Sequence, residues 1–163
     1  MPTIMKKTRY ILPSIIALLC CSFLFWNQGA SAKMKLSDFK LTNTDGKPVS
    51  AESLKGKTVF LNIWATWCGP CIAEMPSIAK AQTALGNKVA FLLASEEDTE
   101  RIRKFEEKRK TGLPLVQLSN GADFGFQAIP LTLIFNEQGE LKYRELGARD
   151  WSTEESIRLI QKP

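Results

Sequence analysis

The feature of this sequence that most restricts its fold is an apolar segment that leads into a Cys-x-x-Cys motif. Residues 58–64 (TVFLNIW) are almost continuously apolar, which is typical of a strand buried on both faces of a sheet. Cys68-Gly69-Pro70-Cys71 follows, and apolar residues at helical spacing predict a helix over 71–85. The two cysteines are therefore expected at the point where a central strand turns into a helix.

A cysteine at the start of a helix is expected to be reactive. Free backbone N–H groups and the positive end of the helix dipole stabilise a thiolate, and they can lower the pKa of a cysteine from about 8.5 to roughly 3.5–7.5. Cys68 is expected at this end, with Cys71 one turn further in. Cys68 would then act as the nucleophile, and Cys71 would resolve a mixed disulfide formed at Cys68.

The chain contains no histidine, and this excludes several other uses of the cysteine pair. Nucleophile activation by a Cys-His or Ser-His-Asp arrangement is not available. A zinc site needs four ligands, and residues 33–163 contain only two cysteines. Covalent haem attachment needs a histidine after the second cysteine, where this chain has Ile72. We therefore expect neither a metal nor another cofactor, and we expect a redox-active disulfide between Cys68 and Cys71.

The first 32 residues match the pattern of an export signal. Three basic residues precede an apolar run over 10–26, and Ala30-Ser31-Ala32 ends the segment. Cleavage after Ala32 is expected. The apolar run is close to the lower length limit for crossing a bilayer, so an uncleaved inner-membrane anchor is the alternative. A lipid anchor at Cys20 or Cys21 is disfavoured, because the residues before them lack the pattern of such a site.

Most of the net charge of +5 comes from this N-terminal segment. Residues 33–163 carry 19 Lys+Arg against 17 Asp+Glu, so the remaining domain is nearly neutral. The mixed run Arg101–Lys110 is best explained as a solvated helix face. With no base-reading motif and little excess charge, nucleic-acid binding is not expected.

Residues 33–163 are expected to form one α/β domain, with a mixed central sheet flanked by helices and an N-terminal β-hairpin. Asp45-Gly46 predicts the turn of that hairpin between segments 39–42 and 47–50. Ser152 and Glu155 predict a capping box for a last helix that ends near Gln161. The other elements expected are strands at 89–94, 115–118, 131–135 and 141–146, a helix at 99–109, and helical turns at 51–54 and 123–127, after a polar lead at 33–37.

The sequence resembles the thioredoxin superfamily. WCGPC follows an apolar strand, and a proline lies five residues after the second cysteine. Residues 39–76, with LNIWATWCGPC and the E-M-P that follows, are similar to the exported TlpA/ResA-like branch, as are GFQAIPLTLIFNEQGEL and GARDW at 147–151. The resemblance covers nearly all of residues 36–163. It implies a thioredoxin fold and an exported thiol-disulfide oxidoreductase.

The resemblance also implies roles for individual residues. Ile129-Pro130 falls where the superfamily has a cis-proline loop, which lies beside the cysteines and holds the substrate chain. Glu74 matches a glutamate of the TlpA/ResA-like branch and could take the proton of Cys71; the alternative is a solvated acid in the first helical turn. Contacts with substrate are also expected at Trp67, Gly69 and Pro70.

Asn62 departs from the thioredoxins proper, which have a buried proton-accepting aspartate at this position. An amide does not titrate, so this departure shifts proton transfer toward Glu74 or water. Trp64, at the end of the apolar segment, is expected to lie in the core, whereas Trp67 is expected to flank the exposed face of Cys68.

The expected function is the reduction of disulfides in exported proteins, in the periplasm or another extracytoplasmic space. The oxidised pair would then need re-reduction by a membrane-bound or extracytoplasmic thiol donor. Gly-Pro between the cysteines favours a reducing pair, because reducing thioredoxins carry it, and the resemblance suggests apocytochrome c as a substrate. Two alternatives are a non-catalytic client-binding module and a thiol peroxidase. The second is disfavoured because Thr66 is two residues before Cys68, not three.

Overall fold

The computed structural model describes residues 34–163, so the predicted signal peptide or anchor lies outside the described residues. Within residues 34–163, no helix combines the length and the apolar character needed to cross a membrane.

The predicted apolar strand is the centre of a seven-stranded mixed sheet, in the order β2-β1-β5-β4-β3-β6-β7. This strand, β3, pairs in parallel with β4 and antiparallel with β6. The last strand, β7, lies at an edge, antiparallel to β6, and its residues alternate between half-buried and exposed. The bounds are β1 (Leu41–Asn43), β2 (Pro48–Val49), β3 (Thr58–Ile63), β4 (Val89–Ser95), β5 (Leu115–Leu118), β6 (Leu131–Phe135) and β7 (Leu141–Leu146).

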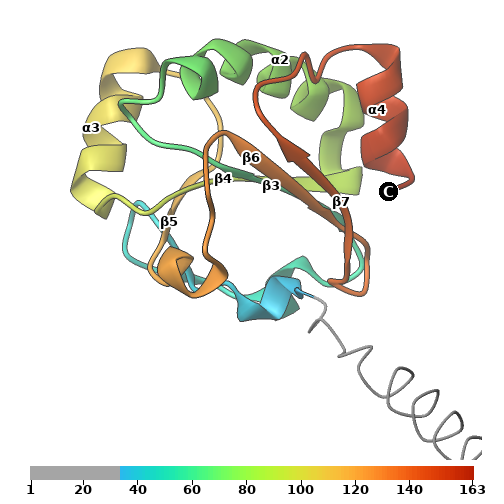
Figure 1. Ribbon diagram of the computed structural model, residues 1–163, viewed down its shortest axis with the longest axis horizontal. Coiled ribbons are helices and arrows are strands. Elements are labelled where there is room, and N and C mark those ends of the chain that lie inside the picture. Colours follow the sequence, from blue (N-terminus) through green and yellow to red (C-terminus); the bar gives the residue numbers. More distant parts are fainter. Residues whose placement is uncertain (1–33) are drawn as a thin grey trace, which may run out of the picture. The chain divides into compact units, whose positions relative to one another are not determined.

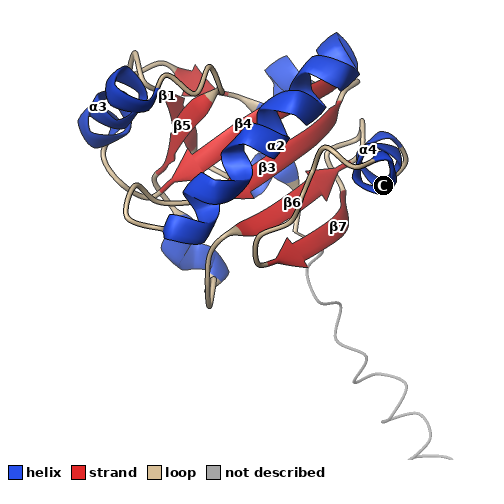
Figure 2. Ribbon diagram, turned by 90° about the horizontal axis from the view of Figure 1, so that it is seen from above, coloured by secondary structure: helices blue, strands red, loops and turns tan. Residues whose placement is uncertain are grey.

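Within residues 34–163, three α-helices cover one face of the sheet, and short 3-10 turns cover the other face (Figure 1). The helices are α2 (Gly69–Leu85), α3 (Thr99–Arg109) and α4 (Glu154–Gln161), and the turns on the other face are η1 (Leu36–Asp38), η2 (Ala51–Leu54) and η4 (Gly121–Phe124). A further turn, η3 (Gly86–Lys88), directly follows α2. Figure 2 shows α2 over the middle of the sheet, along β3 and β4, with α3 and α4 to either side of it.

Alternate side chains of β3 enter two hydrophobic clusters, one on each face of the sheet. Phe60 packs on the helix side, where its ring centroid lies 4.9 Å from those of both Phe91 and Trp151. Leu61 and its neighbours on the opposite face pack in the second cluster. Because both faces of β3 are covered, its sequence is apolar at nearly every position rather than at every second one.

The predicted α/β class with a mixed sheet and an N-terminal hairpin is confirmed. The hairpin forms between β1 and β2, and β1 joins it to the main sheet by pairing with β5. The helix at 99–109 and the strands at 115–118, 131–135 and 141–146 have the predicted bounds. Helix α2 begins two residues earlier than predicted, at Gly69, and it continues past Pro76.

Three local predictions are wrong. The lead at 33–37 is not simply polar, because Leu36 is buried in the second cluster and donates its N–H to the Gly139 carbonyl. The turn predicted at 123–127 lies at 121–124 and is ended by Gly125, which has φ +57°. The last helix is capped by Thr153 rather than Ser152, because Asp150 binds both the N–H and the hydroxyl of Ser152.

The central position of β3 predicts a large effect of truncating its side chains. Leu61 is fully buried, whereas Leu146 is 56% exposed. Leu61→Ala is expected to lower the free energy of unfolding by about 2–5 kcal/mol. The same change at Leu146 is expected to cost less than about 0.5 kcal/mol. Urea unfolding of the two oxidised variants measures this difference, and equal losses would contradict the assignment of β3 to the core.

Candidate active site

The two cysteines of the motif form a disulfide at the start of α2. Their Cα atoms are 5.3 Å apart, and Cys68 is the N-cap residue of the helix. The Cys68 sulfur accepts a hydrogen bond from the backbone N–H of Cys71, at 3.2 Å. Cys71 is fully buried, and Cys68 is 5% exposed. The predicted placement, with Cys68 at the helix end and Cys71 one turn inside, is therefore observed.

Backbone hydrogen bonds hold the residues between β3 and the cysteines in place. The N–H of Trp64 donates to the Ala94 carbonyl at 3.0 Å, and the N–H of Cys68 donates to Ala65 at 3.1 Å. Trp64 is buried, as predicted, and packs against Phe105, with ring centroids 4.8 Å apart. Trp67, in contrast, is 74% exposed, and it directly precedes Cys68 in the sequence.

Glu97 fixes the same loop from the end of β4, and the sequence analysis missed it. Its carboxylate accepts two hydrogen bonds of 2.7 Å from Thr66, one from the backbone N–H and one from the hydroxyl. Ser95 donates to Glu97 as well, at 3.1 Å. The only sequence signal was a pair of acids directly after a buried strand, which does not identify their partner.

Glu74 lies on the buried side of α2, so the alternative of a solvated acid is wrong. The residue is 4% exposed and lies one turn beyond Cys71. Its carboxylate accepts hydrogen bonds from Asn62 Nδ2 at 2.9 Å, the Arg149 backbone N–H at 3.1 Å and Trp151 Nε1 at 3.1 Å. Burial raises the pKa of Glu74 above its ordinary value, and the three hydrogen bonds reduce this shift.

Asn62 lies opposite Glu74 on β3 and is fully buried. Its Nδ2 donates to both Glu74 Oε1 and Thr132 Oγ1, at 2.9 and 3.0 Å. Its Oδ1 has no hydrogen-bond partner among residues 34–163. An amide can turn over and present either its donor or its acceptor. Asn62 therefore has a free acceptor that a protonated carboxyl group could use.

The donors Arg149 and Trp151 come from the GARDW segment, to which the sequence analysis assigned no role. The Arg149 guanidinium donates to Ser156 and to Glu155, both at 2.9 Å, and lies 5.6 Å from the Trp151 ring centroid. These contacts hold the segment in place beside α2. The only sequence signal for it was the resemblance of GARDW to the exported branch.

A cavity of about 380 Å³ lies beside the loop that leads into the disulfide, and neither Cys68 nor Cys71 is among the residues that line it. Trp67 and Ile129 both line it, and the Ile129–Pro130 peptide bond is cis, as the resemblance implied. Gly69 and Pro70 are exposed on the surface and do not line the cavity. The structure thus brings Trp67 and Ile129 together, while their contact with a substrate stays a prediction.

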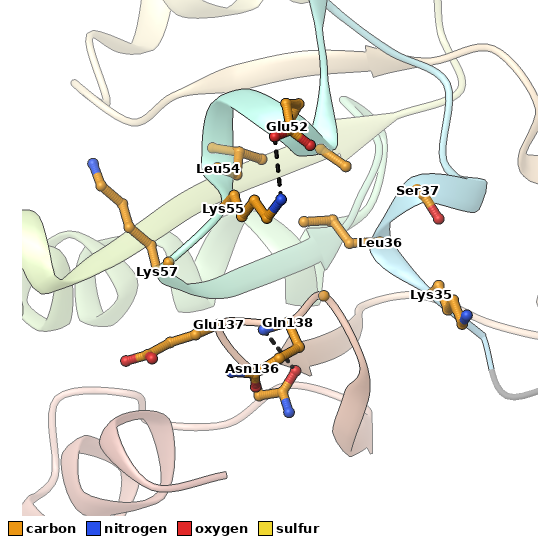
Figure 3. Close-up of a pocket in the computed structure, with 13 residues that line it drawn as sticks. Lys35, Leu36, Ser37, Glu52, Leu54, Lys55, Lys57, Asn136, Glu137 and Gln138 are labelled. Atoms are coloured by element: carbon orange, nitrogen blue, oxygen red, sulfur yellow. Dashed lines mark hydrogen bonds and ion pairs between the residues drawn. The ribbon is translucent and has the colours of Figure 1, made fainter.

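A second cavity, of about 480 Å³, lies at the opposite end of β3 (Figure 3). Lys57 and Asn136 line it, and an ion pair between Lys55 and Glu52, at 3.4 Å, spans part of its wall. Of the two cysteines that the structure describes, neither lines this cavity. Within residues 34–163, no group of three or more His, Cys, Asp or Glu side chains could hold a metal ion.

Comparison with known proteins agrees with this geometry. A family model described as Redoxin matches residues 31–158. Thioredoxin-like protein YneN of Bacillus subtilis is 28% identical over 151 residues, which cover 83% of this chain and 89% of YneN. Thiol-disulfide oxidoreductase ResA of Halalkalibacterium halodurans is 29% identical over 139 residues, which cover 81% of this chain and 78% of ResA.

Solved structures confirm the predicted thioredoxin fold. StoA from Bacillus subtilis superimposes with a TM-score of 0.60 at 23% identity, over 76% of this chain and 93% of StoA. A thiol:disulfide interchange protein of the thioredoxin family from Chlorobium tepidum superimposes with a TM-score of 0.64 at 22% identity, over 82% of this chain and 99% of its own.

The raised pKa of Glu74 predicts how stability depends on pH. At a pH below the ordinary glutamate pKa of 4.5, Glu74 is protonated in both the folded and the unfolded chain. Its ionisation then does not lower the stability of the fold. As the pH rises, the unfolded chain loses this proton first, so stability falls until the pH passes the raised pKa of the folded protein. Relative to Glu74→Gln, the oxidised wild type is expected to lose stability over this range. Denaturant unfolding at several pH values measures the difference, with the exposed Glu137→Gln as the control, and a difference that rises with pH would contradict the prediction.

Proposed function

This chain belongs to the Redoxin family and is a TlpA/ResA-like thiol-disulfide oxidoreductase, and we propose that it reduces disulfides of exported proteins with Cys68 and Cys71 as the reacting pair. The observation that carries the proposal is the disulfide at the N-terminus of α2, one turn from a buried carboxyl group. Two thiols at this site can donate two electrons and close to the disulfide seen in the structure.

In the first step, the Cys68 thiolate attacks one sulfur of the substrate disulfide. A mixed disulfide forms, and the other substrate sulfur leaves as a thiolate. The N–H of Cys71 already points at the Cys68 sulfur, at 3.2 Å, and would stabilise its negative charge together with the helix dipole. Cys71, in addition, is fully buried. For both reasons Cys68 is the better nucleophile of the two.

In the second step, Cys71 attacks Cys68 and releases the second substrate sulfur. The Cys71 thiol must lose a proton for this attack, and Glu74 would accept it. A raised pKa suits a carboxylate to that task, because it makes the carboxylate a stronger base. Asn62 supports both states of Glu74: its Nδ2 donates to the carboxylate now, and its unpartnered Oδ1 could accept from the protonated group.

The cavity beside the loop before Cys68 would receive the substrate segment, with Trp67, Ile129 and Pro130 in contact with it. Gly69 and Pro70 would meet the substrate from the exposed start of α2. We place the protein outside the cytoplasm, exported by a cleaved signal peptide or tethered through residues 10–26. A membrane-bound or extracytoplasmic thiol donor would return two electrons to the pair, and the ResA name of its relatives makes apocytochrome c a substrate to test.

Serine variants distinguish catalysis from client binding. Cys68→Ser is expected to abolish reduction of a protein disulfide, because the thiol that attacks the substrate is missing and Cys71 is fully buried. Cys71→Ser is expected to accumulate covalent complexes through Cys68, because the resolving thiol is missing. Non-reducing gels of cells expressing the full chain measure both, and the double serine variant controls for Cys20 and Cys21. If the wild type reduces no protein disulfide and Cys68→Ser binds clients as the wild type does, the client-binding alternative holds instead.

The redox potential of the pair tests the direction of the reaction. A reducing pair is expected to equilibrate with glutathione near the thioredoxin value of about −270 mV. A potential well above about −200 mV, toward the strong oxidants near about −120 mV, would show that the protein oxidises rather than reduces its substrates.

The role of Glu74 is tested in the resolving step alone. A chromogenic thiol is coupled to Cys68, and its release reports the attack by Cys71. Glu74→Gln is expected to slow this release about 100-fold near neutral pH, and to move its pH profile to that of the unaided thiol. Glu137→Gln is the control. An unchanged profile in Glu74→Gln would exclude Glu74 as the proton acceptor.

A further inference from the structure

The cavity beside the loop before Cys68 has both apolar and acidic lining residues. Trp67 and Ile129 line it together with half-buried Phe126. Among residues 34–163, Glu96 and Glu97 are the charged residues that line it, and neither lysine nor arginine does. A bound segment with a positive charge would therefore be attracted to this cavity, and one with a negative charge would be repelled.

The two carboxylates differ in what they already bind. Glu97 is occupied by the loop before the cysteines, through its two 2.7 Å hydrogen bonds from Thr66, and it lies 3.5 Å from the Arg101 guanidinium. Glu96 is exposed, and among residues 34–163 its carboxylate has neither a hydrogen-bond nor an ion-pair partner. Glu96 is thus the group at this cavity with capacity to bind a cation.

A glycine leaves the space in which the Glu96 side chain lies. A Cβ atom at Gly121 would come within 1.9 Å of Glu96 Oε1 and 2.4 Å of its Cδ. The φ angle of Gly121 is not positive, so its backbone conformation does not require glycine. The missing side chain at 121 instead accommodates the carboxyl group. In the structure, the Glu96 carboxyl group therefore lies over Gly121.

We propose that the cavity selects substrates with a lysine or arginine next to the target disulfide, and that Glu96 pairs with this cation. The proposal rests on the reductase function proposed above. The exposed ring of Trp67 and the ring of Phe126 would pack against the long aliphatic part of such a side chain, and an aromatic face also attracts the cation itself. A cation beside the disulfide would in addition stabilise the leaving substrate thiolate.

The test uses three disulfide-bonded peptides that differ only in having Lys, Gln or Glu next to one cysteine. The rate at which the reduced full chain reduces each peptide is measured at low ionic strength. The wild type is expected to reduce the Lys peptide about fivefold faster than the Gln peptide, which is the upper range for a partly exposed ion pair. The Glu peptide is expected to be the slowest.

Two variants assign this preference to Glu96. Glu96→Gln is expected to lower the rate for the Lys peptide to that for the Gln peptide. Gly121→Ala, which displaces the carboxyl group without changing the net charge, is expected to weaken the preference. Glu137→Gln removes the same charge at the other cavity and is expected to retain the preference.

The outcomes separate this proposal from the one on which it rests. Equal rates for the Lys and Gln peptides in the wild type, or a preference that survives Glu96→Gln, would overturn the role of Glu96 and leave the reductase function intact. Failure to reduce any of the three peptides would contradict both.

Discussion

The buried carboxyl group of Glu74, on α2, determines much of the structure around it. Burying an ionised carboxylate costs several kcal/mol unless hydrogen bonds compensate. Glu74 receives three such bonds, from Asn62 on β3 and from Arg149 and Trp151 in the segment before α4. The central strand, the cysteine helix and the C-terminal segment thus meet at one side chain. Cys71 is held one helical turn from it, which is where a proton acceptor for that thiol is needed.

The parts of the fold with strong local signals could be predicted from the sequence. Strand β3 was identified because a strand covered on both faces needs apolar residues at nearly every position. Helix α3 has the predicted bounds: Gly112-Leu113-Pro114 stops it soon after Arg109, and the structure shows that Asp98, which the sequence analysis did not use, caps its start. The placement of Cys68 at a helix start required only that a strand end before the motif and a helix begin within it.

The parts that depend on distant contacts could not be predicted. Trp151 donates to Glu74 across 77 positions, and Thr66 donates to Glu97 across 31, so no local pattern indicates either pair. The choice between Ser152 and Thr153 as the helix cap failed for a related reason. Both residue types cap helices well, and Asp150 decides between them by binding Ser152. The cis bond before Pro130 was expected only through the resemblance, since X-Pro bonds are seldom cis.

The last fifteen residues have a consequence for how such chains can diverge. They add no strand to the sheet, yet their backbone and one indole ring supply two of the three donors to Glu74. Suppose that recombination replaced this terminus with that of a relative that has no donor at residue 151. Glu74, on a helix more than 60 residues away, would then lose one of its three hydrogen bonds. The terminus and α2 are therefore expected to be inherited together.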